Sequence, residues 1–349
     1  MRYGHRGDPV PGRRVARADG AASPPAVAAV AAVATCSHER RARADTRNDR
    51  WFRGLLQACA LLVLAVLLGA ALSTAWGGRE VLLGQGWRFL GSAQWDPVTN
   101  NYGALAPVFG TLVTSLIALL LAVPLAFGIA LFLTRTAPPW LRGPLGTAVE
   151  LLASIPSIIY GMWGLFAFVP FMARVEPWLS ASLGRLPLIG CWFQGPPLGL
   201  GLLTAGIVLA VMILPFISAV MREVFQAVPA QLIEAAHALG ATTWEVAWQI
   251  VLPYTRAAVI GGIFLGLGRA LGETMAVTFV LGNSYAISGS LLMPGTSIAS
   301  SIANEFNEAV GTHRSALLAL AFLLFVVTFA VLLAARLLLR RMTRREGLR

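Results

Sequence analysis

The sequence predicts an all-α membrane protein with six transmembrane helices. Of its 349 residues, 57% are hydrophobic and only 12% are charged, whereas a soluble domain carries about 25% charged residues. Six apolar runs are each long enough to cross the hydrocarbon core of a bilayer, which takes about 20 helical residues. A helix is favoured in each run because it satisfies every backbone hydrogen bond without water.

The first predicted span begins at Leu55 and the last ends near residue 339. Prolines lie inside several of them: Pro124 breaks the second span, Pro156 lies within the third, and Pro215 lies near the end of the fourth. Neighbouring helices can cover the backbone groups that such prolines free. The predicted spans are about 55–76, 107–133, 147–171, 199–221, 257–282 and 315–339, with Trp51, Trp76, Trp140 and Trp178 at interface depth.

Residues 1–50 differ from the rest, because they are rich in Arg, Ala and Pro and contain few large apolar side chains. We predict a disordered cytoplasmic extension here, followed by a permease-like domain over 51–349. The apolar stretch 26–34 is too short to span a bilayer. The core of a signal peptide is the alternative for it.

The distribution of arginine predicts that both termini are cytoplasmic. With the N-terminus inside, the inside segments hold 21 arginines and the outside segments hold 5, while Arg269 lies within a span. Inside loops carry the excess of basic residues in membrane proteins.

Composition also bounds the chemistry. All 27 basic residues are arginine, so the chain has no Walker A motif, whose lysine contacts the phosphates of ATP. ATP hydrolysis, if the function needs it, must come from another subunit, and the chain itself is not predicted to be an enzyme. Cys36, Cys59 and Cys191 show no metal-ligand spacing. No metal, cofactor or nucleic-acid site is expected.

The longest inside segment, 222–256, has two short helical patterns separated by Gly240 and ending at Pro253. Within it lie seven residues at fixed spacing: Glu234, Ala235, Ala236, Gly240, Ile250, Leu252 and Pro253. They resemble, position by position, the EAA loop of ABC importer permeases. The resemblance implies a coupling helix that enters a groove on an ATPase subunit. An ordinary alanine-rich loop helix with a glycine cap is the plainer alternative, in which Gly240 ends the first helix and Pro253 stops the second.

The fifth predicted span contains two charges, Arg269 and Glu273, four residues apart and so on one helical face. Charges at this depth are costly and usually face a cavity or a partner, and guanidinium suits phosphate geometry. We interpret Arg269 as lining a translocation path for an oxyanion, with Glu273 holding it or limiting tight binding. The alternative is a structural ion pair that joins two helices.

Three further segments extend the resemblance: 100–115, 155–161 with Pro156 and Tyr160, and the run Gly268 to Val277 followed by Asn283. From about residue 51 onward the chain is similar to the PstC-type permease of the phosphate-specific ABC transporter. The resemblance implies a type I importer fold in the bacterial inner membrane. It also implies a role for Arg269 and Glu273 in phosphate passage.

The resemblance implies partners as well: a paralogous PstA-type permease, two ATPase subunits and a periplasmic phosphate-binding protein. Three alternatives remain at this point. One is an ABC permease for another oxyanion, such as molybdate, tungstate or phosphonate. The others are a secondary transporter or channel that works without ATP, and a sensory membrane component that reports phosphate supply.

Overall fold

The structure is a computed structural model that describes residues 25–186 and 190–346, with side chains between Trp51 and Arg340 in those ranges. Internal contacts divide the chain into two units, Met1–Leu68 and Gly69–Arg349. Each unit is described by itself.

The first unit contains most of the helix α1, Pro25–Gly77. From Trp51 to Leu68 its large apolar side chains are exposed, as expected for a segment surrounded by lipid. Helix is present from Pro25, where the sequence led us to expect disorder as far as residue 50. Alanine and arginine, which dominate residues 26–50, have high helix propensity. Residues 1–24 lie outside the described residues.

The second unit contains the end of α1 and all remaining elements. Short elements precede the second span: α2 (Arg79–Gly84), α3 (Trp87–Gly91) and the antiparallel strands β1 (Trp95–Asp96) and β2 (Asn101–Tyr102). The other described helices are α4 (Leu105–Leu131), η1 (Phe132–Thr136), α5 (Pro139–Ala153), α6 (Ser157–Trp163), η2 (Gly164–Phe168), α7 (Val169–Leu183), η3 (Gly190–Phe193), α8 (Leu202–Gln226), α9 (Ala230–Ala238), α10 (Thr243–Val246), η4 (Ala247–Val251), α11 (Leu252–Leu271), α12 (Met275–Leu281), α13 (Ile298–Glu305) and α14 (Gly311–Glu346). Of these, η1, η2 and η4 are π-helical turns.

The described residues contain six helices that are long and apolar enough to cross a membrane, which confirms the predicted number. They are Trp51–Gly77, Leu105–Thr136, Ser157–Leu183, Leu202–Gln226, Thr243–Leu271 and Gly311–Arg340.

Two predicted spans were placed wrongly. The third begins at Ser157 rather than at 147, because the chain bends at 154–156 and Pro156 becomes the residue that precedes α6. The fifth ends at Leu271 rather than at 282, because the helix breaks at Gly272. Pro124 does not break the second span: α4 continues through it.

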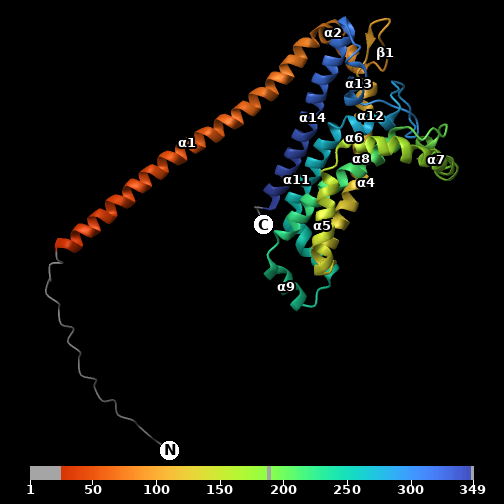
Figure 1. Cartoon of the computed structure of the whole chain (residues 1–349). Helices are drawn as coiled ribbons and strands as arrows, with labels where there is room; N and C mark the ends of the chain where they lie inside the picture. Colours follow the sequence, from red (N-terminus) through yellow and green to blue (C-terminus); the bar gives the residue numbers. More distant parts are fainter. Residues whose placement is uncertain (1–24, 187–189, 347–349) are drawn as a thin grey trace, which may run out of the picture. The chain divides into compact units, whose positions relative to one another are not determined.

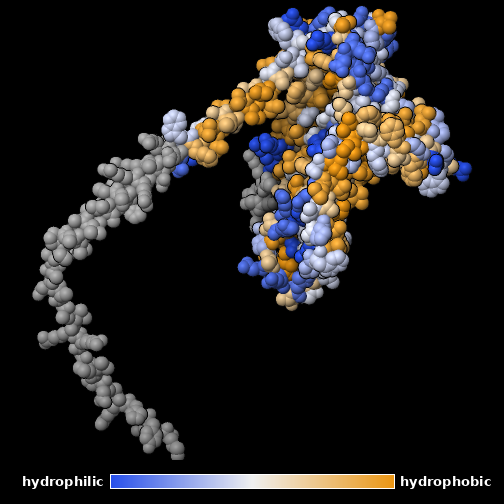
Figure 2. All heavy atoms as spheres, in the orientation of Figure 1, coloured by the Kyte–Doolittle hydropathy of each residue, from blue (hydrophilic) through white to orange (hydrophobic). Residues whose placement is uncertain are grey.

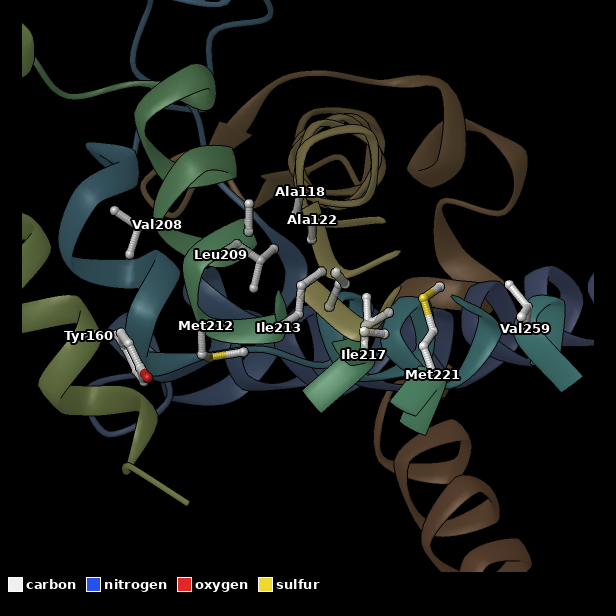
Figure 3. Close-up of a cluster of buried hydrophobic side chains, with 14 of the residues drawn as sticks. Ala118, Ala122, Tyr160, Val208, Leu209, Met212, Ile213, Ile217, Met221 and Val259 are labelled. Carbon is white, nitrogen blue, oxygen red and sulfur yellow. The ribbon is translucent and has the colours of Figure 1, made fainter. Parts of the chain in front are cut away.

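The core is built around α8, which packs along α4 and also contacts α5, α11 and α12. Figure 3 shows large apolar residues of α8, among them Leu209, Ile213 and Ile217, facing the small residues Ala118 and Ala122 of α4. Small residues on one helix let a second helix approach closely, which is how helices associate in a bilayer.

The second unit has two distinct ends. Figure 1 shows α9 at one end and α2, β1 and α13 at the other. In Figure 2 hydrophobic residues cover the flank between these ends, and hydrophilic residues collect at both of them. This distribution fits a unit that crosses a bilayer, with each end in an aqueous phase.

Candidate translocation and coupling sites

Arg269 and Glu273 lie on opposite sides of a helix break. Arg269 is in the last turn of α11, and Gly272 caps that helix. Glu273 precedes α12 and accepts a hydrogen bond from the Ala276 amide at 3.3 Å. The prediction that both charges share one helical face was therefore wrong, because the sequence shows no proline at the break. Among the described residues no ion pair joins them.

The Arg269 side chain is exposed, with its guanidinium carbon 5.8 Å from the centre of the Phe216 ring. Its position at the end of α11 is electrostatically favourable, because the last carbonyls of a helix carry partial negative charge. The guanidinium also lies close enough to Tyr160 for its charge to act on that hydroxyl. The cation thus has an aromatic neighbour and an open side.

Tyr160 and Gly161 bring a second predicted segment to the same place. The Tyr160 hydroxyl donates to the Leu152 carbonyl at 2.9 Å and so bridges the bend between α5 and α6. A Cβ at Gly161 would lie 2.8 Å from the Met275 carbonyl oxygen. Only glycine allows α6 to approach α12 this closely, so segments 155–161 and 268–277 meet across this contact.

The segment 100–115 meets the loop before α13. Thr111 accepts a hydrogen bond from the Ile298 amide at 3.0 Å, and a Cβ at Gly110 would collide with the Thr296 carbonyl. Asn283, with a left-handed backbone (φ 51°), accepts from the Ser300 hydroxyl at 3.2 Å. The three further segments that carry the resemblance thus take part in two contacts, one at the start of α12 and one beyond its end.

The predicted coupling loop forms a helical hairpin. Glu234, Ala235 and Ala236 lie on α9, with the first two exposed. Gly240 has φ 87°, and two backbone bonds close the helix end: Gly240 N to His237 O and Ala241 N to Ala236 O. This is a Schellman motif, which confirms that Gly240 ends the first helix.

The second part of the loop differs from our prediction. Pro253 does not stop a helix, because α10, η4 and α11 run on as one membrane-crossing helix. Proline at this point removes one backbone donor, and the π-turn η4 lies directly before it. Ile250 and Leu252 pack against the same apolar cluster that contains Ala236. The structure therefore brings six of the seven loop residues into one compact element and leaves Pro253 exposed beside it.

A polar cluster lies at the end of the unit opposite to α9. Glu305 of α13 accepts hydrogen bonds from Trp95 Nε1 at 2.9 Å and from the Tyr285 hydroxyl at 2.6 Å, and it lies 2.8 Å from His313 Nε2. Trp95 stacks on Tyr285, and Tyr102 stacks on His313. Burial raises the pKa of the Tyr285 and Tyr102 hydroxyls above the usual value, so both stay protonated at neutral pH. We call this set the Glu305 cluster.

Neither Glu305 nor Glu176 was predicted from the sequence to have a functional or structural role. Glu176 of α7 is 1% exposed, and one of its oxygens accepts from the Gly199 amide at 2.9 Å. Its other oxygen is buried with no partner among the described residues. Glu176 could have been noticed in the sequence as a lone carboxylate between apolar residues. The predicted third span ended at 171, however, and so left Glu176 in a loop.

Comparison with known proteins gives consistent matches. The family described as "binding-protein-dependent transport system inner membrane component" matches residues 122–344. A phosphate transport system permease protein PstC of Xylella fastidiosa (strain 9a5c) is 64% identical, covering 87% of this chain and 94% of its own length. The protein of the same name from Mesorhizobium japonicum is 50% identical, covering 89% and 96%. These matches confirm the PstC-type resemblance.

Solved structures show the same fold at low sequence identity. A chain of the inward-facing MetNI methionine ABC transporter is 18% identical, with a TM-score of 0.50, and covers 71% of this chain and 99% of its own. A chain of a bacterial alginate ABC transporter, in complex with its alginate-bound periplasmic protein, is 19% identical with a TM-score of 0.58, covering 86% and 97%. The fold is that of a type I ABC importer permease, in a multi-pass protein of the bacterial inner membrane. By sequence and fold, this chain belongs to the family of binding-protein-dependent transport system inner membrane components.

Proposed function

We propose that this chain is the permease subunit that, with a paralogous partner, forms the path for inorganic phosphate across the inner membrane. The observation that carries the proposal is the high identity, over nearly their whole length, to relatives named phosphate transport system permease protein PstC. Permeases for molybdate, tungstate or phosphonate are not favoured by these names. A channel that works without ATP is not favoured by the family match.

Arg269 is the residue we assign to the phosphate path. Its guanidinium is exposed, and among the described residues it forms no ion pair with a carboxylate. Glu273 does not neutralise it, because that carboxylate accepts from the Ala276 amide and orders the start of α12. An arginine with free donors suits the planar recognition of phosphate oxygens.

The coupling loop is assigned to an ATPase subunit. The hairpin from α9 to α10 presents Leu232, Leu239 and Trp244 to solvent, with exposures of 43%, 89% and 66%. Large apolar side chains exposed together at an aqueous end of the molecule are typical of a protein interface. Nucleotide-driven closure of two ATPase subunits would then move α11 directly, because α10, η4 and α11 form one helix.

These assignments fix the orientation that we propose. The end with α9 faces the cytoplasm, as do both termini, and the end with the Glu305 cluster faces the periplasm. A periplasmic phosphate-binding protein would dock at that second end. Residues 51–349 form the permease domain, and residues 1–50 form a cytoplasmic extension of it. A sensory role in phosphate supply is compatible with this assembly but has no separate support.

ATP-dependent uptake of radiolabelled phosphate into vesicles that contain the whole complex tests the proposal. A charge-assisted hydrogen bond contributes about 1.5–3 kcal/mol, so Arg269→Ala should reduce uptake at least about tenfold while the complex still assembles. Arg174→Ala, which removes an exposed arginine on α7, is the matched control and should transport normally.

Two results would contradict the proposal. Normal uptake by Arg269→Ala would remove that residue from the path. If the wild-type complex moved molybdate or phosphonate but no phosphate, the assignment of the substrate would be wrong while that of the permease would stand.

A further inference from the structure

An open apolar groove runs along the membrane-crossing part of α4 and its turn η1, with α5 as its second wall. Its volume is about 540 Å³, within the range of roughly 300–1,000 Å³ typical of small-molecule sites. Leu125 and Phe132 are 56% and 42% exposed in it. A Cβ at Gly128 would meet nothing within 4 Å, so the middle of the groove is unfilled. The lining residues are Pro124, Leu125, Gly128, Ile129, Phe132, Leu133, Leu145 and Val149.

Two arginines lie at one end of this groove. Arg142 precedes the lining residues Leu145 and Val149 by three and seven positions, so all three share one face of α5. Its Nε donates to the Ala137 carbonyl at 2.7 Å, which holds the guanidinium beside the turn between the helices. Arg135 lies in η1, two residues after the lining residue Leu133, and the charge of Arg142 is close enough to act on it.

These two cations have no carboxylate partner among the described residues. Glu150, on the same helix as Arg142, is paired with Arg222. Arg135 donates through one Nη to the Phe225 carbonyl at 3.0 Å, but its Nε is buried with no partner. Arg135 is half-buried and Arg142 is exposed. Like charges that lie close together are stabilised by an external anion.

Trp140, 74% exposed, lies between the two arginines in sequence. Tryptophan at the end of a span marks the depth of the lipid head groups. The groove therefore runs from the hydrocarbon core, at Leu125, to the head-group region, at Arg142. An apolar groove with cations at its polar end is complementary to a lipid that has a negatively charged head group.

We propose that this groove binds an anionic phospholipid, with one acyl chain beside Gly128 and the head-group phosphate against Arg142 and Arg135. Basic pockets between membrane helices bind anionic head groups in this way. The lipid neutralises two like charges and fills a surface that the other described residues of the second unit leave open. The inference concerns the bilayer and does not depend on which substrate the permease carries.

Photo-crosslinking in the intact complex tests the inference. Phosphatidylglycerol with a diazirine in one acyl chain is incorporated into nanodiscs with the complex, and the labelled peptides are mapped by mass spectrometry. Phosphatidylglycerol should label residues 124–149 more strongly than phosphatidylcholine that carries the same diazirine. One arginine near the membrane surface contributes about 1 kcal/mol, so Arg142→Gln should reduce the labelling about fivefold.

Two variants separate the charge from the groove. Arg174→Gln, which removes an exposed arginine on α7, should leave the labelling of 124–149 unchanged. Gly128→Leu fills the groove without changing any charge and should abolish the labelling there, while the melting temperature of the complex is retained. Because a Cβ at Gly128 would meet no atom within 4 Å, this variant remains informative even if Arg142→Gln fails to fold.

Equal labelling by the two lipids, or an equal loss in Arg142→Gln and Arg174→Gln, would overturn the proposal. So would absence of lipid labelling together with a crosslink from cysteine placed at position 128 to the partner permease. That result would show that a protein covers the groove.

Discussion

Glu273 shows how a single carboxylate can act on a helix rather than on the charge next to it in sequence. It accepts from the amide of Ala276, at the second position of α12, and so satisfies one of the donors that a helix start leaves open. Arg269 interacts instead with the end of α11. The two residues therefore contribute to the same break through different helix termini, and their substitutions should give different results.

We predict that Glu273→Ala destabilises the protein by about 0.5–2 kcal/mol, the usual cost of losing a helix cap. Glu273→Gln keeps a side-chain oxygen that can accept from Ala276, so its melting temperature in detergent should be close to that of the wild type. Equal destabilisation by the two variants would show that the negative charge, and not the cap, is what the fold requires. Uptake by the glutamine variant then reports separately on the role of the charge in transport.

At the scale of elements, the hairpin from α9 to α10 depends on one backbone conformation. Gly240 has φ 87°, and no atom lies within 4 Å of a Cβ placed there. The cost of a side chain at this position is therefore conformational and not steric. The capping box between Thr242 and Glu245 begins the next helix two residues later, so the direction of α9 is set by a very short connection.

Gly240→Ala should weaken retention of the ATPase subunit about fivefold, since the left-handed conformation costs about 1 kcal/mol for a residue with a Cβ. Asparagine adopts this conformation more readily, so Gly240→Asn should lie close to the wild type. The measurement is the amount of ATPase subunit that copurifies with the permease over a range of concentrations. Indistinguishable alanine and wild-type proteins would mean that the hairpin does not set the interface.

The number of spans could be predicted from the sequence, but the positions of the helix breaks could not. The apolar runs gave the number of spans, because burial in lipid requires about 20 apolar residues whatever the tertiary structure. The same reasoning placed a break at Pro124 and a continuous helix through Pro156, and the structure has the reverse. Ser154 donates its hydroxyl to the Leu151 carbonyl and so competes with the helix just before Pro156, whereas Pro124 lies among helix-forming apolar residues.

For the whole molecule, the Glu305 cluster joins parts of the chain that are far apart in sequence. Trp95 and Tyr102 come from the strands after the first span, Tyr285 from the loop after α12, and His313 from the start of the last span. One carboxylate therefore fixes the end of the molecule that we assign to the periplasm. Nothing in the sequence pattern marks Glu305 apart from Glu308, because the distinction arises only when these segments meet.

Glu305→Ala leaves Trp95 and Tyr285 without their acceptor, and we expect it to destabilise the protein by about 1–3 kcal/mol. Glu308→Ala, at an exposed position three residues on, is the matched control and should have no effect. Thermal melting of the purified complex in detergent measures both. A Glu305→Ala variant as stable as its control would show that the stacked rings hold this end without the carboxylate.

The π-turn η4 sets the direction, around the helix axis, in which the later side chains of the fifth span point. One π-turn holds one residue more than the α-helix needs, and each residue advances an α-helix by about 100° around its axis. If η4 tightened into a regular α-helix with its sequence unchanged, Arg269 would turn by about that angle, away from the side it now faces. The direction in which this cation points is therefore determined 18 to 22 residues earlier, next to the loop that we assign to the ATPase.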